Sequence, residues 1–211
     1  VDMYRGIIQE GNWVREGSYL RGVVQEYGLD RNVGRGRIYR LVHDDFKPGP
    51  RPCMLDESTA QLVSHLAHPN GWWRDTAQKL IVLRGDLSVV RDLRAMMTSH
   101  HMPLARNHAM WTLEGLGKLE PADVIARLSD ADAQVRASAI RAGEQFLSES
   151  FHQGVVDSFF AMVTDRDESV LLQLLRSALY TQLVGHEPLV ESIVTSHPDN
   201  CAITQTAKVY F

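Results

Sequence analysis

Four polar residues near the start of the chain, Tyr4, Arg5, Gln9 and Glu10, combine a planar cation with a carboxylate and could contact a substrate or a cofactor. They follow a short β-like run, which would hold them at the end of a strand. The alternative role is structural, with Arg5 and Glu10 tying this strand to the helix that follows. We favour the structural role and keep Tyr4, Arg5 and Glu10 as candidates for cofactor binding.

A second group of candidates lies at the starts of predicted helices: Trp72, Trp73, Arg74, Arg106 and Arg136. Tryptophan and arginine are enriched at protein-binding hot spots, so these residues could form an interaction surface. The alternative is packing, with the tryptophans filling a seam and Arg74 pairing with a carboxylate in a turn. Because Arg106 and Arg136 recur at the position of Arg74 in successive units, we favour a structural ladder.

Histidines raise the question of a metal site, at His65 and His68 and at His100, His101 and His108. Neither group has an Asp, Glu or Cys at a spacing typical of metal ligands, so we predict solvated loops and no metal site. The sequence also lacks Gly-x-Ser-x-Gly, a glycine-rich phosphate loop and Cys-x-x-Cys-His. We therefore predict no catalytic residues and no covalently attached haem in this chain.

The composition is typical of a globular protein, with 44% hydrophobic and 23% charged residues. The 22 basic and 26 acidic residues give a net charge of −4, which argues against nucleic-acid binding. No apolar run reaches the ~18 residues of a membrane-spanning helix. Cys53 and Cys201 are too far apart in sequence to suggest a disulfide framework or a metal site, and we expect two thiols rather than one long-range disulfide.

The elements that must position these residues differ between the two ends of the chain. Residues 1–46 contain two β-like runs, at 1–8 and 36–43, and a predicted helix at 18–27 that Gly28 would end. Residues 47–55 are rich in proline, which disfavours helix and central strand, so we place a linker there. Because the chain opens abruptly at Val1, we expect it to be a piece of a longer protein.

From residue 56 to 211 the pattern is helical, and it repeats. Arg74, Arg106, Arg136 and Leu171 occupy one register, about every 30 to 35 residues. Such a period is typical of a solenoid whose helical hairpins bury a shared core. The helices are predicted at residues 57–67, 73–84, 87–99, 104–116, 121–128, 133–147, 154–164, 168–184 and 188–196, and the tail after residue 198 is left unassigned.

The helix at 133–147 shows the repeat most clearly. Asp132 is placed to cap its first turn. Three residues after each register position comes Ala77, Ala109, Ala139 or Leu174, and the alanines allow a second helix to approach closely.

The run Asp132-Ala-Gln-Val-Arg-Ala-Ser-Ala139 resembles a HEAT-type repeat and is echoed at residues 70–77 and 102–109. This resemblance covers residues 56–196. It implies a mainly α fold, an α-α solenoid of HEAT-like hairpins, preceded here by a small β-containing segment.

Residues 1–146 resemble a narrower family, the membrane-bound dehydrogenases of planctomycetes and their relatives. The blocks at residues 2–10, 19–21, 28–31 and 34–40 are similar to the end of its propeller, which is itself similar to those of soluble glucose and sorbosone dehydrogenases. The run His68-Pro-Asn-Gly-Trp-Trp-Arg-Asp-Thr-Ala-Gln78 resembles the start of the HEAT segment that follows the propeller. Residues 1–46 would then be the remnant of a propeller blade with a helical insertion.

The resemblance implies that the parent protein is an exported, periplasmic sugar or alcohol dehydrogenase with pyrroloquinoline quinone and a c-type cytochrome domain. Most of the propeller and the haem-binding motif would lie outside this chain, which alone would bind neither cofactor. We therefore expect a non-catalytic structural and interaction segment, whose partners are the rest of the parent polypeptide. The alternatives are a stand-alone HEAT scaffold that binds a protein partner, and a fragment that keeps catalytic activity.

Overall fold

The computed structural model describes residues 2, 15–148 and 152–210, and the described part is mainly helical. The chain divides into two compact units, Val1–Arg51 and Pro52–Phe211, which are described separately below. The division falls within residues 47–55, where the sequence predicts a linker. Within the described ranges, no helix is long and apolar enough to cross a membrane.

Among the described residues of the first unit, α1 (Tyr19–Glu26) is followed by a short 3-10 helix at Leu29–Arg31. The Ser18 side chain caps α1 by accepting a hydrogen bond from the Arg21 amide at 3.2 Å. Gly28 follows α1 with φ of 60°, in the left-handed region that glycine adopts without strain. The predicted helix over residues 18–27 and its glycine stop are thus confirmed.

The β-containing segment predicted before the helices is not confirmed. The run at residues 1–8 lies, apart from Asp2, outside the described residues. Over residues 36–43 the only pairing among described residues is one antiparallel bridge, in which Asp2 and Arg37 exchange backbone hydrogen bonds of 2.8 and 2.7 Å. Ile38 and Leu41 are largely exposed. A strand needs a longer ladder and a buried face, and residues 36–43 show neither among the described residues.

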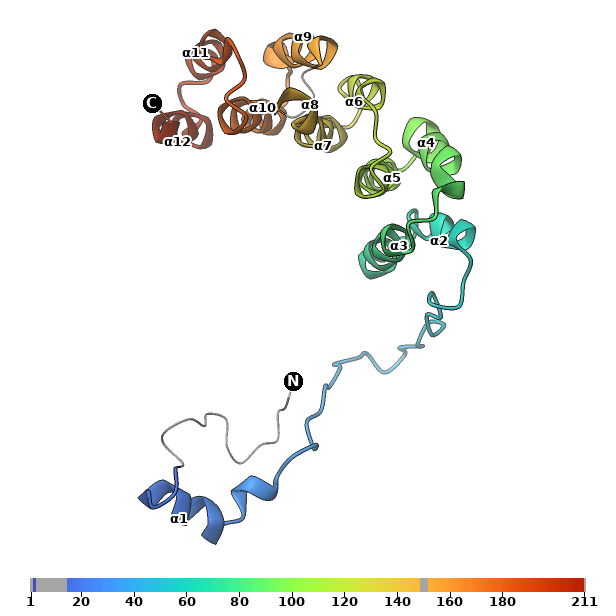
Figure 1. Ribbon diagram of the computed structural model, residues 1–211, viewed down its shortest axis with the longest axis vertical. Coiled ribbons are helices and arrows are strands. Elements are labelled where there is room, and N and C mark those ends of the chain that lie inside the picture. The colour runs from blue at the N-terminus through green and yellow to red at the C-terminus, as the bar shows by residue number, and fades with distance from the viewer. Residues whose placement is uncertain (1, 3–14, 149–151, 211) are drawn as a thin grey trace. The chain divides into compact units, whose positions relative to one another are not determined.

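The second unit is built from pairs of helices, and consecutive helices of each pair are joined by short turns (Figure 1). Their bounds are α2 (Thr59–His65), α3 (Gly71–Arg84), α4 (Val90–Ser99), α5 (Pro103–Gly115), α6 (Pro121–Arg127), α7 (Ala133–Gly143), α8 (Gln145–Ser148), α9 (Gln153–Ala161), α10 (Glu168–Tyr180), α11 (His186–Ser196) and α12 (Cys201–Tyr210).

The second helices of the pairs pack against one another in chain order and form one layer, which we call the second-helix layer. It consists of α3, α5, α7, α10 and α12, and each contacts the next. The first helices, α2, α4, α6, α9 and α11, lie on the other side of this layer in Figure 1. The core lies between the two sets of helices and runs from Met54 to Ala207.

Small residues allow the close approach within the second-helix layer. Ala77, Ala109 and Ala139 are each fully buried, and so is Leu174 at the equivalent position of α10. The sequence register therefore places these residues in the core, as predicted. No single helix pair could bury these side chains alone, so neighbouring pairs depend on each other for stability.

Most helix bounds differ from the sequence prediction by one to three residues, and three regions differ more clearly. The helix predicted over residues 133–147 ends at Gly143, and α8 follows after Glu144. The helix predicted over 168–184 ends at Tyr180, shortly before Gln182, whose φ is 50°. The tail that was left unassigned forms α12, whose buried Ile203 packs into the core. Asp132 caps α7 as predicted, by accepting hydrogen bonds from the amides of Gln134 and Val135.

Candidate functional site

The first group of predicted site residues, Tyr4, Arg5, Gln9 and Glu10, lies outside the described residues. Nothing in the described part of the chain bears on their role, and cofactor binding by Tyr4, Arg5 and Glu10 stays a prediction.

The two tryptophans of the second group lie in different environments. Trp73 packs against the core, and its ring stacks on His68 with 4.7 Å between centroids. Its ring centroid also lies 5.0 Å from that of His65. Trp72 begins the same helix but remains 54% exposed. Trp73 therefore has the packing role, and Trp72 is the one whose side chain is available for contact.

Arg106 joins two turns. Its Nε and Nη2 donate to the two carboxylate oxygens of Asp130, at 2.9 and 2.6 Å. Its Nη1 donates to the carbonyl oxygens of His100 and His101, at 2.8 and 3.3 Å. The carbonyls belong to the turn before α5, whereas Asp130 belongs to the turn before α7. A single guanidinium thus connects one helix pair to the next.

Arg136 repeats this arrangement one pair later. Its Nε and Nη2 donate to Asp165 at 2.7 and 2.8 Å, and its Nη1 donates to the carbonyls of Asp130 and Ala131 at 2.9 and 3.2 Å. Bidentate pairs of this kind are stronger and more directional than single hydrogen bonds. The recurring arginines form the ladder that the sequence register predicts.

The turns before α3, α5, α7 and α10 each contain an acceptor side chain two residues ahead of the N-cap. This side chain accepts a hydrogen bond from the N-cap amide at 2.9 to 3.1 Å. The acceptors are His68, His100, Asp130 and Asp165. Two are histidine Nδ1 atoms and two are carboxylates, and only the carboxylates receive an arginine from the preceding pair.

Arg74 donates to backbone carbonyls in its own turn, as Arg106 and Arg136 do, but it does not pair with a carboxylate in the next turn. Its Nη1 donates to the carbonyls of His68 and Pro69 at 2.6 and 3.0 Å. Its Nε is buried and has no hydrogen-bond partner among the described residues. In the next turn, the position equivalent to Asp130 holds His100. The ladder is therefore incomplete at its first step.

The pKa values of the ladder carboxylates reflect these contacts. Burial alone would raise the pKa of Asp130, but hydrogen bonds from Arg106 and the Asp132 amide, with the charge of Arg127, hold it below its ordinary value of 3.8. The pKa of Asp165 is lowered in the same way, because Arg136 outweighs burial. Both groups are therefore carboxylates at neutral pH.

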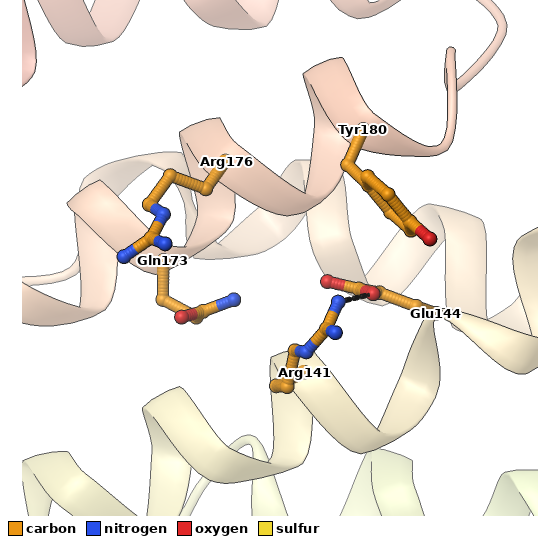
Figure 2. Close-up of a pocket in the computed structure, with 5 residues that line it drawn as sticks. All are labelled: Arg141, Glu144, Gln173, Arg176 and Tyr180. Carbon is orange, nitrogen blue, oxygen red and sulfur yellow. Dashed lines mark hydrogen bonds and ion pairs between the residues drawn. The ribbon is translucent and has the colours of Figure 1, made fainter. Parts of the chain in front are cut away.

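A polar hollow of about 260 Å³ lies between α7 and α10, apart from the ladder (Figure 2). Its lining combines two cations, a carboxylate, an amide and a phenol. The lining residues are Arg141, Glu144, Gln173, Arg176 and Tyr180.

The carboxylate of the hollow is held from two sides. Glu144 is 8% exposed and forms an ion pair with Arg141. Its Oε1 accepts a hydrogen bond of 2.6 Å from the buried Ser177 hydroxyl, which in turn accepts one of 3.0 Å from Gln173 Nε2. The Arg141 guanidinium also lies 5.5 Å from the Tyr180 ring centroid, in a cation–π arrangement.

The two arginines of the hollow differ in their contacts. The Arg141 side chain is 52% exposed even though it is paired with Glu144. Arg176 is exposed and has no hydrogen-bond or ion-pair partner within residues 15–148 and 152–210. Figure 2 shows the Gln173 side chain between the two guanidinium groups. Arg141 is thus held in place by Glu144, whereas the Arg176 guanidinium has no partner among the described residues.

The hollow was not predicted from the sequence, although a signal was present. Arg141 and Arg176 each come five residues after a register position, at 136 and 171. Lys79 and Trp111 hold the equivalent places after Arg74 and Arg106. The register that predicts the core could therefore have drawn attention to these positions as well.

A second hollow, of about 400 Å³, lies between α3 and α5. Its walls are more apolar and include Val82, Leu83 and Trp111. The α3 and α5 helices approach closely here: a Cβ on Gly115 would lie only 2.8 Å from Val82 Cγ2, so the contact requires glycine or a shift of Val82.

The histidines do not gather into a metal site in the described ranges, where no group of three or more His, Cys, Asp or Glu side chains is placed to hold a metal ion. His108 Nδ1 instead contacts Gln78 Oε1 at 2.7 Å, and the rings of His100 and His101 stack with centroids 4.6 Å apart. Cys53 and Cys201 are exposed and not joined in a disulfide.

No protein-family profile and no curated protein matches this sequence.

Proposed function

We propose that this chain is a HEAT-like α-solenoid segment with a non-catalytic, structural and interaction role. The observation that carries the proposal is the repeated bidentate pair of Arg106 with Asp130 and of Arg136 with Asp165. Each pair joins consecutive turns at the same place in the helix pair. Such a repeat gives neighbouring pairs one defined spacing, which suits a rigid support for other domains.

The larger protein that we propose for this support is an exported quinone-dependent sugar or alcohol dehydrogenase. The argument is the order of the two sequence blocks, the propeller-like one before residue 46 and the HEAT-like one from residue 68. In that arrangement pyrroloquinoline quinone would sit in the propeller and haem c in a cytochrome domain, both outside this chain. The segment would space these domains in the periplasm.

The coding sequence on either side of residues 1–211 tests the dehydrogenase part. We expect propeller blades upstream and a Cys-x-x-Cys-His motif downstream. A start codon immediately before Val1 and a stop codon after Phe211 would contradict it.

The purified chain tests the non-catalytic part. We expect no dye reduction when pyrroloquinoline quinone, calcium and glucose are added together. Quinone-dependent dye reduction that follows the chain's concentration would overturn this role.

The second candidate function is a stand-alone HEAT scaffold that binds a protein partner. It is favoured by the two hollows of the second-helix layer, which Arg176 and Trp111 line. The coding sequence separates the two candidates, because a scaffold of this kind would have no propeller or cytochrome domain beside it.

A further inference from the structure

Four residues of the second-helix layer, Lys79, Trp111, Arg141 and Arg176, each come five residues after a register position. Lys79, Arg141 and Arg176 are exposed, whereas Trp111 is partly buried against the core. Lys79 and Trp111 line the hollow between α3 and α5, and Arg141 and Arg176 line the hollow between α7 and α10. The same position of the repeat thus contributes to both hollows.

The charges differ between the two hollows. Asp75 and Glu114 line the hollow between α3 and α5 together with Lys79, so its cation has acidic neighbours. The hollow between α7 and α10 contains Arg141 and Arg176 and only one carboxylate, Glu144, which is already bound by Arg141 and Ser177. The formal charge of this hollow is therefore positive.

We propose that the hollow between α7 and α10 binds a carboxylate side chain from an acidic, extended segment of a partner protein. Arg176 would make the main contact, through the two parallel hydrogen bonds that a guanidinium donates to a carboxylate. Arg141 would add its charge from the other side, held in place by Glu144 and by the ring of Tyr180. This inference rests on the interaction role proposed above, and it names the chemistry of the partner.

The Glu144 carboxylate leaves the hollow with one net positive formal charge, which a single carboxylate of the partner would neutralise. A phosphate group carries close to two negative charges at neutral pH and would leave the hollow with a net negative charge. The charge of the hollow therefore matches Asp or Glu more closely than a phosphorylated residue.

The size of the hollow favours a side chain over a small-molecule cofactor. Its volume of about 260 Å³ is below the ~300–1,000 Å³ that is typical of ligand pockets. A peptide could place its carboxylate in this hollow while its other side chains contact the second-helix layer. The apolar hollow lined by Leu83 and Trp111 offers a further contact on this layer.

Titration with a synthetic peptide tests the inference on the full chain. The probe is the peptide acetyl-Gly-Ser-Glu-Gly-Glu-Ser-Gly-amide, added to the ¹⁵N-labelled protein. Binding is monitored by NMR through the arginine Nε–Hε signals. We expect saturable shifts of the Arg141 and Arg176 signals. The same peptide with Gln in place of Glu should shift neither, and neither should a phosphoserine peptide at equal concentration.

Substitution of Arg176 is the decisive variant, because this side chain is exposed and its loss should not affect folding. Arg176→Gln should weaken binding of the Glu peptide by about tenfold, the effect of losing one charged hydrogen-bonding group. Arg176→Lys should recover only part of the affinity, because an ammonium group lacks the fork. The matched control is Arg91→Gln on α4, which is also exposed and unpaired within the described ranges and should leave binding unchanged.

Three outcomes would overturn the inference: equal shifts of the Arg91 and Arg176 signals, unchanged affinity in Arg176→Gln, or tighter binding of the phosphoserine peptide. The readout is local to the arginines and does not depend on the neighbouring coding sequence. If the titration fails but propeller blades are found upstream, only the carboxylate site is rejected. If the titration succeeds but stop codons flank the coding sequence, only the dehydrogenase assignment is rejected.

Discussion

Arg136 and Asp165 form a bidentate ion pair across the boundary between two helix pairs, with distances of 2.7 Å from Nε to Oδ2 and 2.8 Å from Nη2 to Oδ1. The remaining Nη1 donates to the carbonyl oxygens of Asp130 and Ala131 in the turn that precedes α7. One side chain thus satisfies backbone acceptors in its own turn and a carboxylate in the next. Any change to either partner should therefore affect two helix pairs together.

Replacing Asp165 should destabilise the second unit. Asp165→Asn keeps the shape of the side chain but leaves the Arg136 guanidinium, only 16% exposed, without an anionic partner. Because an uncompensated buried charge is costly, we expect a loss of about 2 kcal/mol in the free energy of unfolding. The midpoint of urea denaturation measures it.

The matched control is Asp199→Asn, at an exposed loop position with no ion pair in the described part of the chain. It should change stability by less than about 0.5 kcal/mol. Equal midpoints for the two variants would contradict a stabilising role for the ladder.

The ladder should also make stability depend on pH in the acidic range. The pKa values of Asp130 and Asp165 lie below their ordinary value of 3.8, because Arg106 and Arg136 outweigh the effect of burial. The stabilisation that follows is fully present above the unfolded pKa and is lost as the pH falls through the folded pKa. The urea midpoint of the wild type should therefore fall between pH 5 and pH 3.

The double variant Asp130→Asn, Asp165→Asn should lose part of this pH dependence, since neither amide titrates. It should start from a lower midpoint at pH 5 and fall less than the wild type does. A parallel fall in both proteins would show that other carboxylates cause the acid sensitivity.

The ladder and the core were predictable because both follow the register of the repeat. Arg106, Arg136 and the alanine three residues after each were placed by spacing alone. The carboxylates that receive the arginines were not, since Asp130 and Asp165 come from the following pair and only the packing of successive pairs brings them close. The same limit applies to the hollow, where Arg141 meets Tyr180 only because α7 packs against α10.

Two elements predicted from the sequence, the helix over residues 133–147 and the strand over residues 36–43, differ from the structure. The helical pattern continues through Glu144, but the chain there ends α7 and begins α8, while the Glu144 side chain turns to Ser177 on α10. Glu144 itself keeps helical φ and ψ of −56° and −34°, so the boundary is a short interruption of the predicted helix. The strand predicted over residues 36–43 is not confirmed, because its predicted neighbour at residues 1–8 lies, apart from Asp2, outside the described residues.

Completing the ladder should stabilise the protein. His100 occupies the place that Asp130 and Asp165 hold in later turns, and its Nδ1 already accepts the Met102 amide as those carboxylates accept theirs. His100→Asp would keep this hydrogen bond and offer a carboxylate to the buried, unpaired Nε of Arg74. We expect a gain of about 1 kcal/mol, measured as a higher urea midpoint.

A double-mutant cycle with Arg74→Gln isolates the new contact. His100→Asp should give no gain when Arg74 is absent, so the coupling between the two positions should be about 1 kcal/mol. A gain of the same size in both backgrounds would assign the effect to the turn itself, and no gain in either would show that the two side chains do not meet.

Gly143 marks a contact that tolerates no side chain. A Cβ there would lie 2.9 Å from Val124 Cγ1 and 3.0 Å from Phe159 Cζ, and both neighbours are buried. Alanine in a helix normally gains up to about 1 kcal/mol over glycine, but overpacking costs about 1–3 kcal/mol. Gly143→Ala should therefore lower the free energy of unfolding by about 1 kcal/mol, measured by urea denaturation. Gly154→Ala in α9 is the matched control, since its nearest neighbours lie at ordinary distances of 3.4–3.5 Å; it should be neutral or stabilising, and an equal loss in both variants would mean that close packing at Gly143 is not the cause.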